Sequence, residues 1–424
     1  MNLYLNTAQN LIKNGFAHIF VGTFLNKAIA MISSVIVARI VDKTDYAYLT
    51  YSETLYGYLT LFLGLGMSSS LLKFCSSKNI TSADKAYLTF SLKYGVLFEV
   101  VITTIFCTVI CFITLPFPHS KFYVVATALY PTLYYMYDLL ITYIRAKQLN
   151  KEYAWYSFLY SIITCASTIV LVFLLSAIGV VYARYISLFF MIGLLLYLNK
   201  DRHTQISVGH LEKKEIRAFM AMALSLMIAN ALSRMMPVNE NLLVSNIIAD
   251  ETTTSNFRVA SLFPQMVILV AQSVMIYYFP ILAEMDNKQR DSRSLVIKVE
   301  LLNVVLVSIS AVLGILLTPW LIVTFYGQKY ADVVTLTYLL WVVHGLNAAL
   351  RTVPINVLIA IQKYKFNLYM NALSVIVQFV LDWYFLVKYG LYGVLYGTFI
   401  VYLLTGVLYW MYYFKVSTIK NKEK

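Results

Sequence analysis

The feature that most constrains this chain is a series of long apolar segments, interrupted near the middle by one long polar run. The run reads NKDRHTQISVGHLEKKEIR and occupies 199–217. Six apolar segments precede it and six of similar length follow it, each with few charges. A membrane-spanning helix needs about 20 mainly apolar residues. The sequence therefore predicts about twelve transmembrane helices.

The low charge content supports a membrane protein over a soluble one. Only 12% of the residues are charged, about half of the fraction typical of a soluble domain. A soluble protein with one very large core would need polar helix faces, which these segments lack. We expect an all-α membrane protein with short outer loops. The spans are predicted at roughly 15–38, 48–72, 90–114, 122–145, 157–177, 180–198, 216–237, 256–283, 296–318, 333–359, 367–387 and 391–414.

The polar run divides the chain into two similar halves. We expect an N-terminal six-helix bundle at 1–198, a cytoplasmic linker at 199–215, and a C-terminal six-helix bundle with a short tail at 216–424. One offset, 146 to 360 and 179 to 393, aligns AKQ with AIQ and GVVY with GVLY, which indicates an internal repeat. With an even number of spans per half, the repeats are parallel and related by a pseudo-twofold axis along the membrane normal.

The formal net charge of +13 reflects orientation in the membrane, not nucleic-acid binding. Most Lys and Arg fall in alternate loops and in the C-terminal tail, and the other loops hold few. The positive-inside rule then places both termini in the cytoplasm. We expect a multi-pass protein of the bacterial inner membrane that has no nucleic-acid partner.

Cysteine and histidine indicate no metal site. Cys75 falls near a loop, whereas Cys107, Cys111 and Cys165 lie inside predicted spans. None has a spacing with His that is typical of metal ligands. We expect no metal, no cofactor and no catalytic residue.

Cations inside the predicted spans mark the candidate binding site, because an ionisable group at membrane depth is costly and usually faces an interior cavity. Lys27 lies 15 residues before Asp42 (27 to 42), and Arg234 lies 16 before Asp250 (234 to 250). At about 1.5 Å per residue both lie roughly 23 Å from the outer end, so the two halves offer a cation at matching depth. Helix packing is the alternative role for the polar residues on these faces. The candidate substrate-binding residues are Lys27, Arg234, Arg258, Arg351, Asn26 and Asn230.

Carboxylates inside the spans are candidates for coupling transport to an ion gradient. A buried carboxyl group can load and release a proton, whereas a nearby Arg or Lys holds it ionised. Glu53 is the first candidate, because it lies on a polar stripe of its span. Asp138 lies about two turns before Arg145, and Glu99 follows Lys93 closely. For these two, a local charge network is the alternative. The candidate set is Glu53, Glu99, Asp138 and Asp382.

Two segments resemble a known family. The segments GFAHIFVGTFLNKAIAMISSVIVARIVDKTDYAYLTYSETLYGYLTLFLGLGMSSSLLKF, at 15–74, and FMAMALSLMIANALSRMMPVNENLLVSNI, at 219–247, resemble the polysaccharide transporter family, specifically the bacterial Wzx O-antigen flippases. The resemblance implies a twelve-helix protein of the multidrug, oligosaccharidyl-lipid and polysaccharide exporter superfamily. It also implies a cationic central cavity, onto which Lys27, Arg234 and Arg258 map. Where related lipid II flippases carry an Arg early in span 2, this chain has Glu53.

The activity that the resemblance implies is transfer of an undecaprenyl-diphosphate-linked oligosaccharide from the cytoplasmic to the periplasmic leaflet. Arg suits bidentate contact with phosphate and Lys offers a point charge, while amides and tyrosines suit sugars. We expect alternating access by the two bundles, reset by an ion gradient, with no enzymatic step. The expected partners are the lipid-linked oligosaccharide, membrane lipid, an O-antigen polymerase and a chain-length regulator.

Three other functions remain open. A drug or small-solute exporter of the same fold would concentrate carboxylates in its cavity. A major-facilitator transporter also has twelve spans, but its usual Gly- and Arg-rich turn is replaced here by KFCSSKNITSADKAYLT. An O-antigen polymerase would be expected to have a sizeable outer loop, and the predicted outer loops are short.

Overall fold

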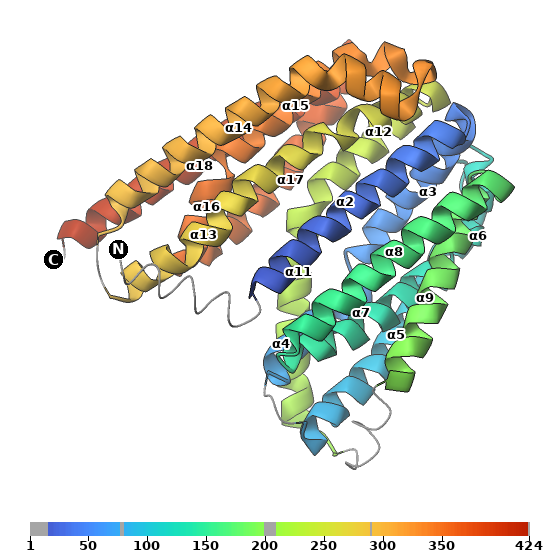
Figure 1. Cartoon of the computed structure of the whole chain (residues 1–424). Coiled ribbons are helices and arrows are strands. Elements are labelled where there is room, and N and C mark those ends of the chain that lie inside the picture. The colour runs from blue at the N-terminus through green and yellow to red at the C-terminus, as the bar shows by residue number, and fades with distance from the viewer. Residues whose placement is uncertain (1–15, 77–79, 199–208, 289–290, 423–424) are drawn as a thin grey trace. The chain divides into compact units, whose positions relative to one another are not determined.

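The computed structural model (Figure 1) describes residues 16–76, 80–198, 209–288 and 291–422, and every regular element in these ranges is a helix. The predicted all-α fold is confirmed. The chain divides into two compact units, Met1–Arg234 and Met235–Lys424. The first unit contains α2 (Phe16–Ile40), α3 (Lys43–Thr60), η1 (Leu63–Gly66), α4 (Met67–Phe74), α5 (Ser82–Phe112), α6 (Ser120–Ala126), α7 (Tyr130–Ala146), α8 (Asn150–Leu175), α9 (Ile178–Leu198) and the first part of α11 (Lys213–Ile247).

The second unit begins inside α11. It continues with α12 (Glu251–Leu262), η2 (Pro264–Val267), α13 (Ile268–Asn287), α14 (Arg293–Leu321), η3 (Ile322–Tyr326), η4 (Gln328–Val333), α15 (Val334–Leu350), α16 (Thr352–Ala360), α17 (Tyr364–Tyr389) and α18 (Leu391–Lys422). The division at 234/235 differs from the predicted linker at 199–215, of which 199–208 lies outside the described residues. The two six-helix bundles with this linker stay a prediction.

The predicted spans correspond closely to the helices. Among the described residues, ten helices are long and apolar enough to cross a membrane. The number is eleven if α6 and α7, which meet at a 41° bend, form one span. Helix α2 occupies the position of the remaining predicted span. The predicted end of span 7 at 237 is wrong, because α11 continues through Pro237 to Ile247.

The second span of the first unit is broken in its middle. Between α3 and α4, three consecutive residues have left-handed backbone conformations: Gly64 (φ 52°), Leu65 (φ 51°) and Gly66 (φ 75°). Such residues interrupt the i→i−4 hydrogen bonds of a helix. Glu99, fully buried on α5, accepts the backbone N–H of Gly64 through its Oε1 at 2.6 Å. The carboxylate therefore satisfies a donor that the break releases.

An apolar core fixes this break against its neighbours. Residues of α4, α5, α7 and the start of α11 form one buried cluster, which includes Leu71, Tyr135, Leu139 and Phe219. Tyr135 is fully buried, and its hydroxyl donates to the Ser91 carbonyl at 2.8 Å. Its ring lies against Gly95 of α5 and Gly64 of η1, where an added Cβ would overlap the ring. The broken span is thus held by close packing.

Helix pairs within each unit lie side by side in matching ways. In the first unit α2 packs along α8 and α8 along α9, and in the second unit α17 packs along α18 (Figure 1). The tight turns that join α8 to α9 and α17 to α18 have Ser176 (φ 55°) and Gly390 (φ 63°) at their starts. These positions are 214 residues apart (176 to 390). Gln148 and Gln362, at the same offset, both have φ 60°.

Close contact between neighbouring helices repeats at this offset of 214 residues as well. A Cβ on Gly179 would lie 2.2 Å from the Leu171 carbonyl oxygen, and one on Gly393 would lie 2.1 Å from the Phe385 carbonyl oxygen. Both positions therefore need glycine, because any side chain would strike the preceding helix. The internal repeat inferred from short sequence matches thus extends to the backbone of the two turns. The direction of its axis stays a prediction.

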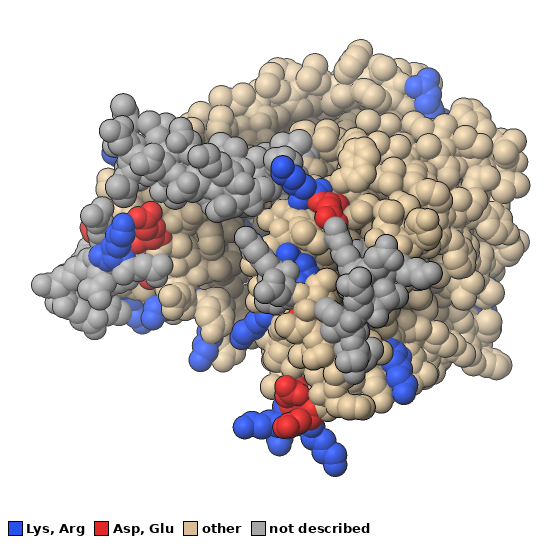
Figure 2. Space-filling model, turned by 60° about the horizontal axis from the view of Figure 1, so that its bottom comes forward, with Lys and Arg blue, Asp and Glu red and all other residues tan. Residues whose placement is uncertain are grey.

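Basic residues outnumber acidic ones on one face of the molecule. Figure 2 shows this face, where Lys and Arg side chains are spread among few Asp and Glu. An excess of this kind is what the positive-inside rule expects of cytoplasmic ends. The orientation of the termini stays a prediction.

Candidate functional site

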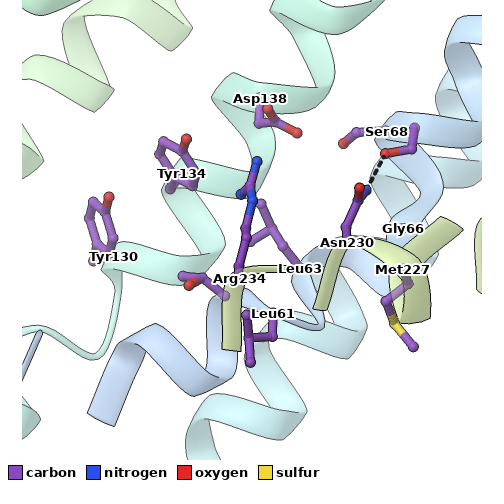
Figure 3. Close-up of a pocket in the computed structure, with 12 residues that line it drawn as sticks. Leu61, Leu63, Gly66, Ser68, Tyr130, Tyr134, Asp138, Met227, Asn230 and Arg234 are labelled. Atoms are coloured by element: carbon purple, nitrogen blue, oxygen red, sulfur yellow. Dashed lines mark hydrogen bonds between the residues drawn. The ribbon is translucent and has the colours of Figure 1, made fainter. Parts of the chain in front are cut away.

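A polar pocket of about 330 Å³ lies within the first unit. This is within the size range of small-molecule sites, about 300–1,000 Å³. Figure 3 shows the side chains that surround it, which come from α3, η1, α4, α7 and α11. It is lined by Thr60, Leu61, Leu63, Gly66, Ser68, Ser69, Tyr130, Tyr134, Asp138, Met227, Asn230 and Arg234. Three predicted site residues, Arg234, Asn230 and Asp138, are therefore brought together here.

The broken span forms one wall of the pocket. Because the chain turns at Gly66, α4 begins at the pocket, with Ser68 and Ser69 in its first turn. A Cβ on Gly66 would lie 2.3 Å from the Ala223 carbonyl oxygen of α11, so α4 and α11 approach closely at this point. The Asn230 amide lies 3.5 Å from the Ser69 hydroxyl across the same contact. The left-handed turn and α11 together set the shape of this wall.

Arg234 and Asp138 face each other in this pocket. In Figure 3 the guanidinium of Arg234, on α11, points toward the carboxylate of Asp138, on α7. Their charges interact, but among the described residues they form no direct ion pair. The rings of Tyr130 and Tyr134 lie on the α7 side of the guanidinium. The pocket thus offers a cation, a carboxylate and several neutral hydrogen-bonding groups.

This arrangement suits a ligand with an anionic group and polar substituents. A guanidinium can bind a phosphate through two parallel hydrogen bonds. Hydroxyl and amide groups such as those of Ser69 and Asn230 can bond sugar hydroxyls, and tyrosine rings can lie against sugar faces. Binding of this kind needs no cofactor or metal. The described residues contain no group of three potential metal ligands.

The other predicted residues of the first unit lie outside this pocket. Asn26 and Lys27 are half-buried on α2 and are not among the residues that line it. Glu53, on α3, forms an ion pair with Arg184 on α9, and the Arg184 guanidinium lies 5.4 Å from the centre of the Tyr130 ring. Glu99 holds the broken span, as described above. The pairing of Glu53 with Arg184 was not expected from the sequence.

Two predicted cations belong to the second unit. Arg258 is half-buried on α12. Arg351, at the junction of α15 and α16, is only 6% exposed. Its guanidinium donates to Asn347 Oδ1 at 3.1 Å and lies 5.0 Å from the centre of the Tyr402 ring. Arg351 is therefore engaged with neighbouring side chains of its own unit.

Asp382 lies in a buried polar cluster of the second unit, formed by α11, α17 and α18. Asp382 and Gln378 are fully buried, and Glu240 is 4% exposed. The Gln378 amide donates to Glu240 Oε1 at 2.7 Å, and the Thr398 hydroxyl lies 3.1 Å from the same oxygen. Thr398 also lies 3.4 Å from Asp382 Oδ2. Among the described residues, none of the groups that act on the two carboxylates is Lys or Arg.

Two carboxylates without a cation cannot both be ionised cheaply in a low-dielectric interior. The cluster is therefore suited to hold a proton or a small cation. Gly397 allows α18 to approach it, because a Cβ there would lie 2.1 Å from Asp382 Oδ1. Glu240 is a residue that sequence reasoning missed, because it lies beyond the predicted end of this span at 237.

Comparison with known proteins places the chain in a family. The model of the family described as "Polysaccharide biosynthesis protein" matches residues 11–286 of the 424. The chain belongs to the polysaccharide biosynthesis protein family. No curated protein matches this family member significantly.

Solved structures similar to this polysaccharide biosynthesis family member are membrane transporters. The inward-facing conformation of a multidrug resistance MATE family transporter of the MOP superfamily has a TM-score of 0.77 and 12% identity, with 94% of this chain and 96% of that one covered. A MOP superfamily transporter from Pyrococcus furiosus Vc1, described as having a binding pocket of reverse polarity, has a TM-score of 0.67 and 12% identity, with 97% and 96% covered. At such identities the likeness shows the fold alone.

The chain thus combines membership of a polysaccharide biosynthesis family with a fold found in transporters. The apolar helices and the transporter fold indicate a multi-pass membrane protein.

Proposed function

We propose that this family member is a flippase that moves an undecaprenyl-diphosphate-linked O-antigen oligosaccharide from the cytoplasmic to the periplasmic leaflet of the bacterial inner membrane. The observation that carries the proposal is the pocket of the first unit, in a chain of the polysaccharide biosynthesis family with a transporter fold. Arg234 supplies the positive charge that a diphosphate requires. Asn230, Ser69 and the two tyrosines supply polar and aromatic surface for the attached sugar.

The substrate's chemistry agrees with the position of this pocket on transmembrane helices. A diphosphate-linked sugar is too polar to cross the hydrocarbon core unaided, because unsatisfied polar groups there are costly. A cavity at membrane depth replaces water with Arg, amide and hydroxyl groups. The polyprenyl tail can meanwhile stay in the lipid. Transport by alternating access then needs no covalent step.

We propose further that the cycle is coupled to an ion gradient through Asp382 and Glu240. This coupling is supported by the buried cluster described above, in which the two carboxylates share the Thr398 hydroxyl. Loading and release of a proton or a small cation changes the charge of this cluster. Such a change is a means by which an ion gradient can bias a conformational equilibrium.

The proposed function is tested by following a labelled undecaprenyl-diphosphate oligosaccharide in reconstituted vesicles. We expect wild type to expose the sugar on the opposite face, Arg234→Ala to abolish this transfer, and Arg234→Lys to retain part of it. Arg217→Ala is a matched control, because Arg217 is exposed on the same helix and does not line the pocket. Full transfer by Arg234→Ala at normal insertion contradicts the assignment of the pocket. Failure of wild type to move the lipid contradicts the flippase proposal and favours an exporter of small soluble compounds.

A further inference from the structure

The relation between Asp138 and Arg234 differs from that in two ion pairs of the first unit. Asp84 and Lys147 form a direct ion pair at 2.7 Å, with both side chains at most 5% exposed. Glu53 and Arg184 also pair directly. These two pairs are closed, and each cation is neutralised by its own partner. Asp138 and Arg234 instead line a cavity together and have no direct contact among the described residues.

The surroundings of Asp138 leave Arg234 as its main charged neighbour. On its own helix, α7, the titratable groups near it are Tyr134, Tyr135 and Tyr137. From α4 the hydroxyl of Ser68 faces it, and from α11 the guanidinium of Arg234 faces it (Figure 3). Glu99 on α5 lies on the other side of Tyr135. Among the residues that line the pocket, Asp138 and Arg234 carry the only full charges.

A carboxylate in this position weakens the binding of an anion. It lowers the positive potential that Arg234 creates in the pocket, and it repels an incoming phosphate at short range. Both effects are strong where water is scarce and the effective dielectric constant is low. When Asp138 is protonated, the repulsion disappears and its hydroxyl becomes a hydrogen-bond donor. The same pocket then favours an anionic ligand.

We propose that Asp138 competes with the anionic group of the substrate for Arg234, so that protonation of Asp138 and binding of the substrate diphosphate favour each other. This inference rests on the proposed function for the identity of the anion. By linkage, the effect is reciprocal. Binding of the diphosphate at Arg234 takes up a proton at Asp138, and release of the substrate releases it. Binding in the pocket of the first unit is then itself linked to protonation, separately from the buried cluster of the second unit.

The test is a binding measurement with inorganic pyrophosphate on the purified full-length protein, carried out by titration calorimetry across a pH series. Wild type is compared with Asp138→Asn at each pH. The quantity of interest is the ratio of their dissociation constants, because the ligand's own ionisation affects both proteins equally and cancels. We expect Asp138→Asn to bind about tenfold more tightly at high pH, within the usual range for coupled sites. We expect the ratio to approach one as the pH falls, because wild-type Asp138 becomes protonated.

Two further variants separate competition from structural damage. Glu284→Gln makes the same chemical change at the ion pair between Glu284 and Lys288, outside the pocket, and should match wild type at every pH. Arg234→Gln should lose binding, and the double variant Asp138→Asn/Arg234→Gln should not regain the affinity of wild type. Melting temperatures establish that each variant is folded.

Several results overturn the inference. If folded Asp138→Asn binds more weakly than wild type, Asp138 positions Arg234 and does not compete for it. A ratio that stays constant with pH removes the link to protonation. If wild type and Asp138→Asn both fail to bind pyrophosphate, the pocket is not an anion site. These outcomes are distinct from failure of the proposed function, which is judged by transfer of the labelled lipid in vesicles: competition without transfer contradicts the flippase alone.

Discussion

Glu240 and Asp382, which are 142 positions apart (240 to 382), face the same hydroxyl group, that of Thr398. A hydroxyl has one proton to donate, so Thr398 can satisfy one of the two carboxylates at a time. Gln378 supplies a further donor, and it is directed at Glu240. The pair therefore has fewer donors than two ionised carboxylates need in a buried site. A bound proton or small cation would supply the missing positive partner of the two carboxylates.

We predict that Asp382→Asn removes the response of transport to an imposed proton or sodium gradient. The amide cannot exchange a proton or bind a cation as the carboxylate does, so the gradient-dependent part of the rate should fall to the rate measured without a gradient. The measurement is transfer of the labelled lipid in vesicles with and without each gradient. Glu284→Gln is the control, because Glu284 lies outside the cluster in an ion pair with Lys288. An unchanged response in Asp382→Asn would show that coupling lies elsewhere.

The ion pair between Glu53 and Arg184 should contribute to the stability of the first unit. Their side chains are 21% and 23% exposed, which is between a surface pair and a fully buried one. Arg184→Gln should therefore lower stability by on the order of 2 kcal/mol, measured by thermal unfolding in detergent. The double variant Glu53→Gln/Arg184→Gln should recover part of this loss, because it leaves no unpaired charge. A double variant that is much less stable than the single one would contradict a simple pairwise role.

Gly95 on α5 should not tolerate even a methyl group. An added Cβ would lie 2.1 Å from the hydroxyl oxygen of the fully buried Tyr135. We predict that Gly95→Ala costs about 2 kcal/mol, as expected of overpacking in a closed core. Gly193→Ala, on helix α9, is the matched control: nothing lies within 4 Å of its added Cβ, and alanine favours helix by about 1 kcal/mol. Equal melting temperatures for the two variants would contradict the packing described around Tyr135.

The buried pair of Lys147 and Asp84 should be sensitive to loss of one partner. Asp84 caps the start of α5 together with Thr81, and Lys147 ends α7. Lys147→Met leaves a buried carboxylate without its cation, so we predict a loss of about 3 kcal/mol. Asp84→Asn/Lys147→Met should be more stable than Lys147→Met alone, since the unpaired charge is gone. The comparison uses thermal unfolding of the three proteins under one detergent condition.

The sequence was sufficient for the number and approximate position of the spans, because hydropathy over about 20 residues depends on composition alone. It also indicated the repeat, since a turn such as Gly179-Val180 requires glycine where two helices meet. The end of α11 was predicted incorrectly. The predicted span ended at 237, whereas α11 continues through Pro237 to Ile247, and Glu240 lies in this last part of the helix.

Pairings between distant residues could not be predicted. Nothing in the local sequence shows that Glu53 meets Arg184 or that Asp138 faces Arg234, because these contacts depend on which helix faces pack together. The left-handed turn at 64–66 was also missed, although two glycines around Leu65 were its signal. The roles of the ionisable residues in binding and coupling stay predictions for the experiments above.

The matching turns at Ser176 and Gly390 have an evolutionary consequence. Two stretches of the chain share backbone torsions and helix contacts at one fixed offset. Duplication of an ancestral gene that encoded one half explains this most simply. After such an event each copy can accumulate changes that the other does not share. Here the copies retain matching turns but differ in their charged groups: at the same offset of 214 residues, Asp138 matches Thr352 and Asp382 matches Thr168. Each carboxylate is therefore present in one copy alone.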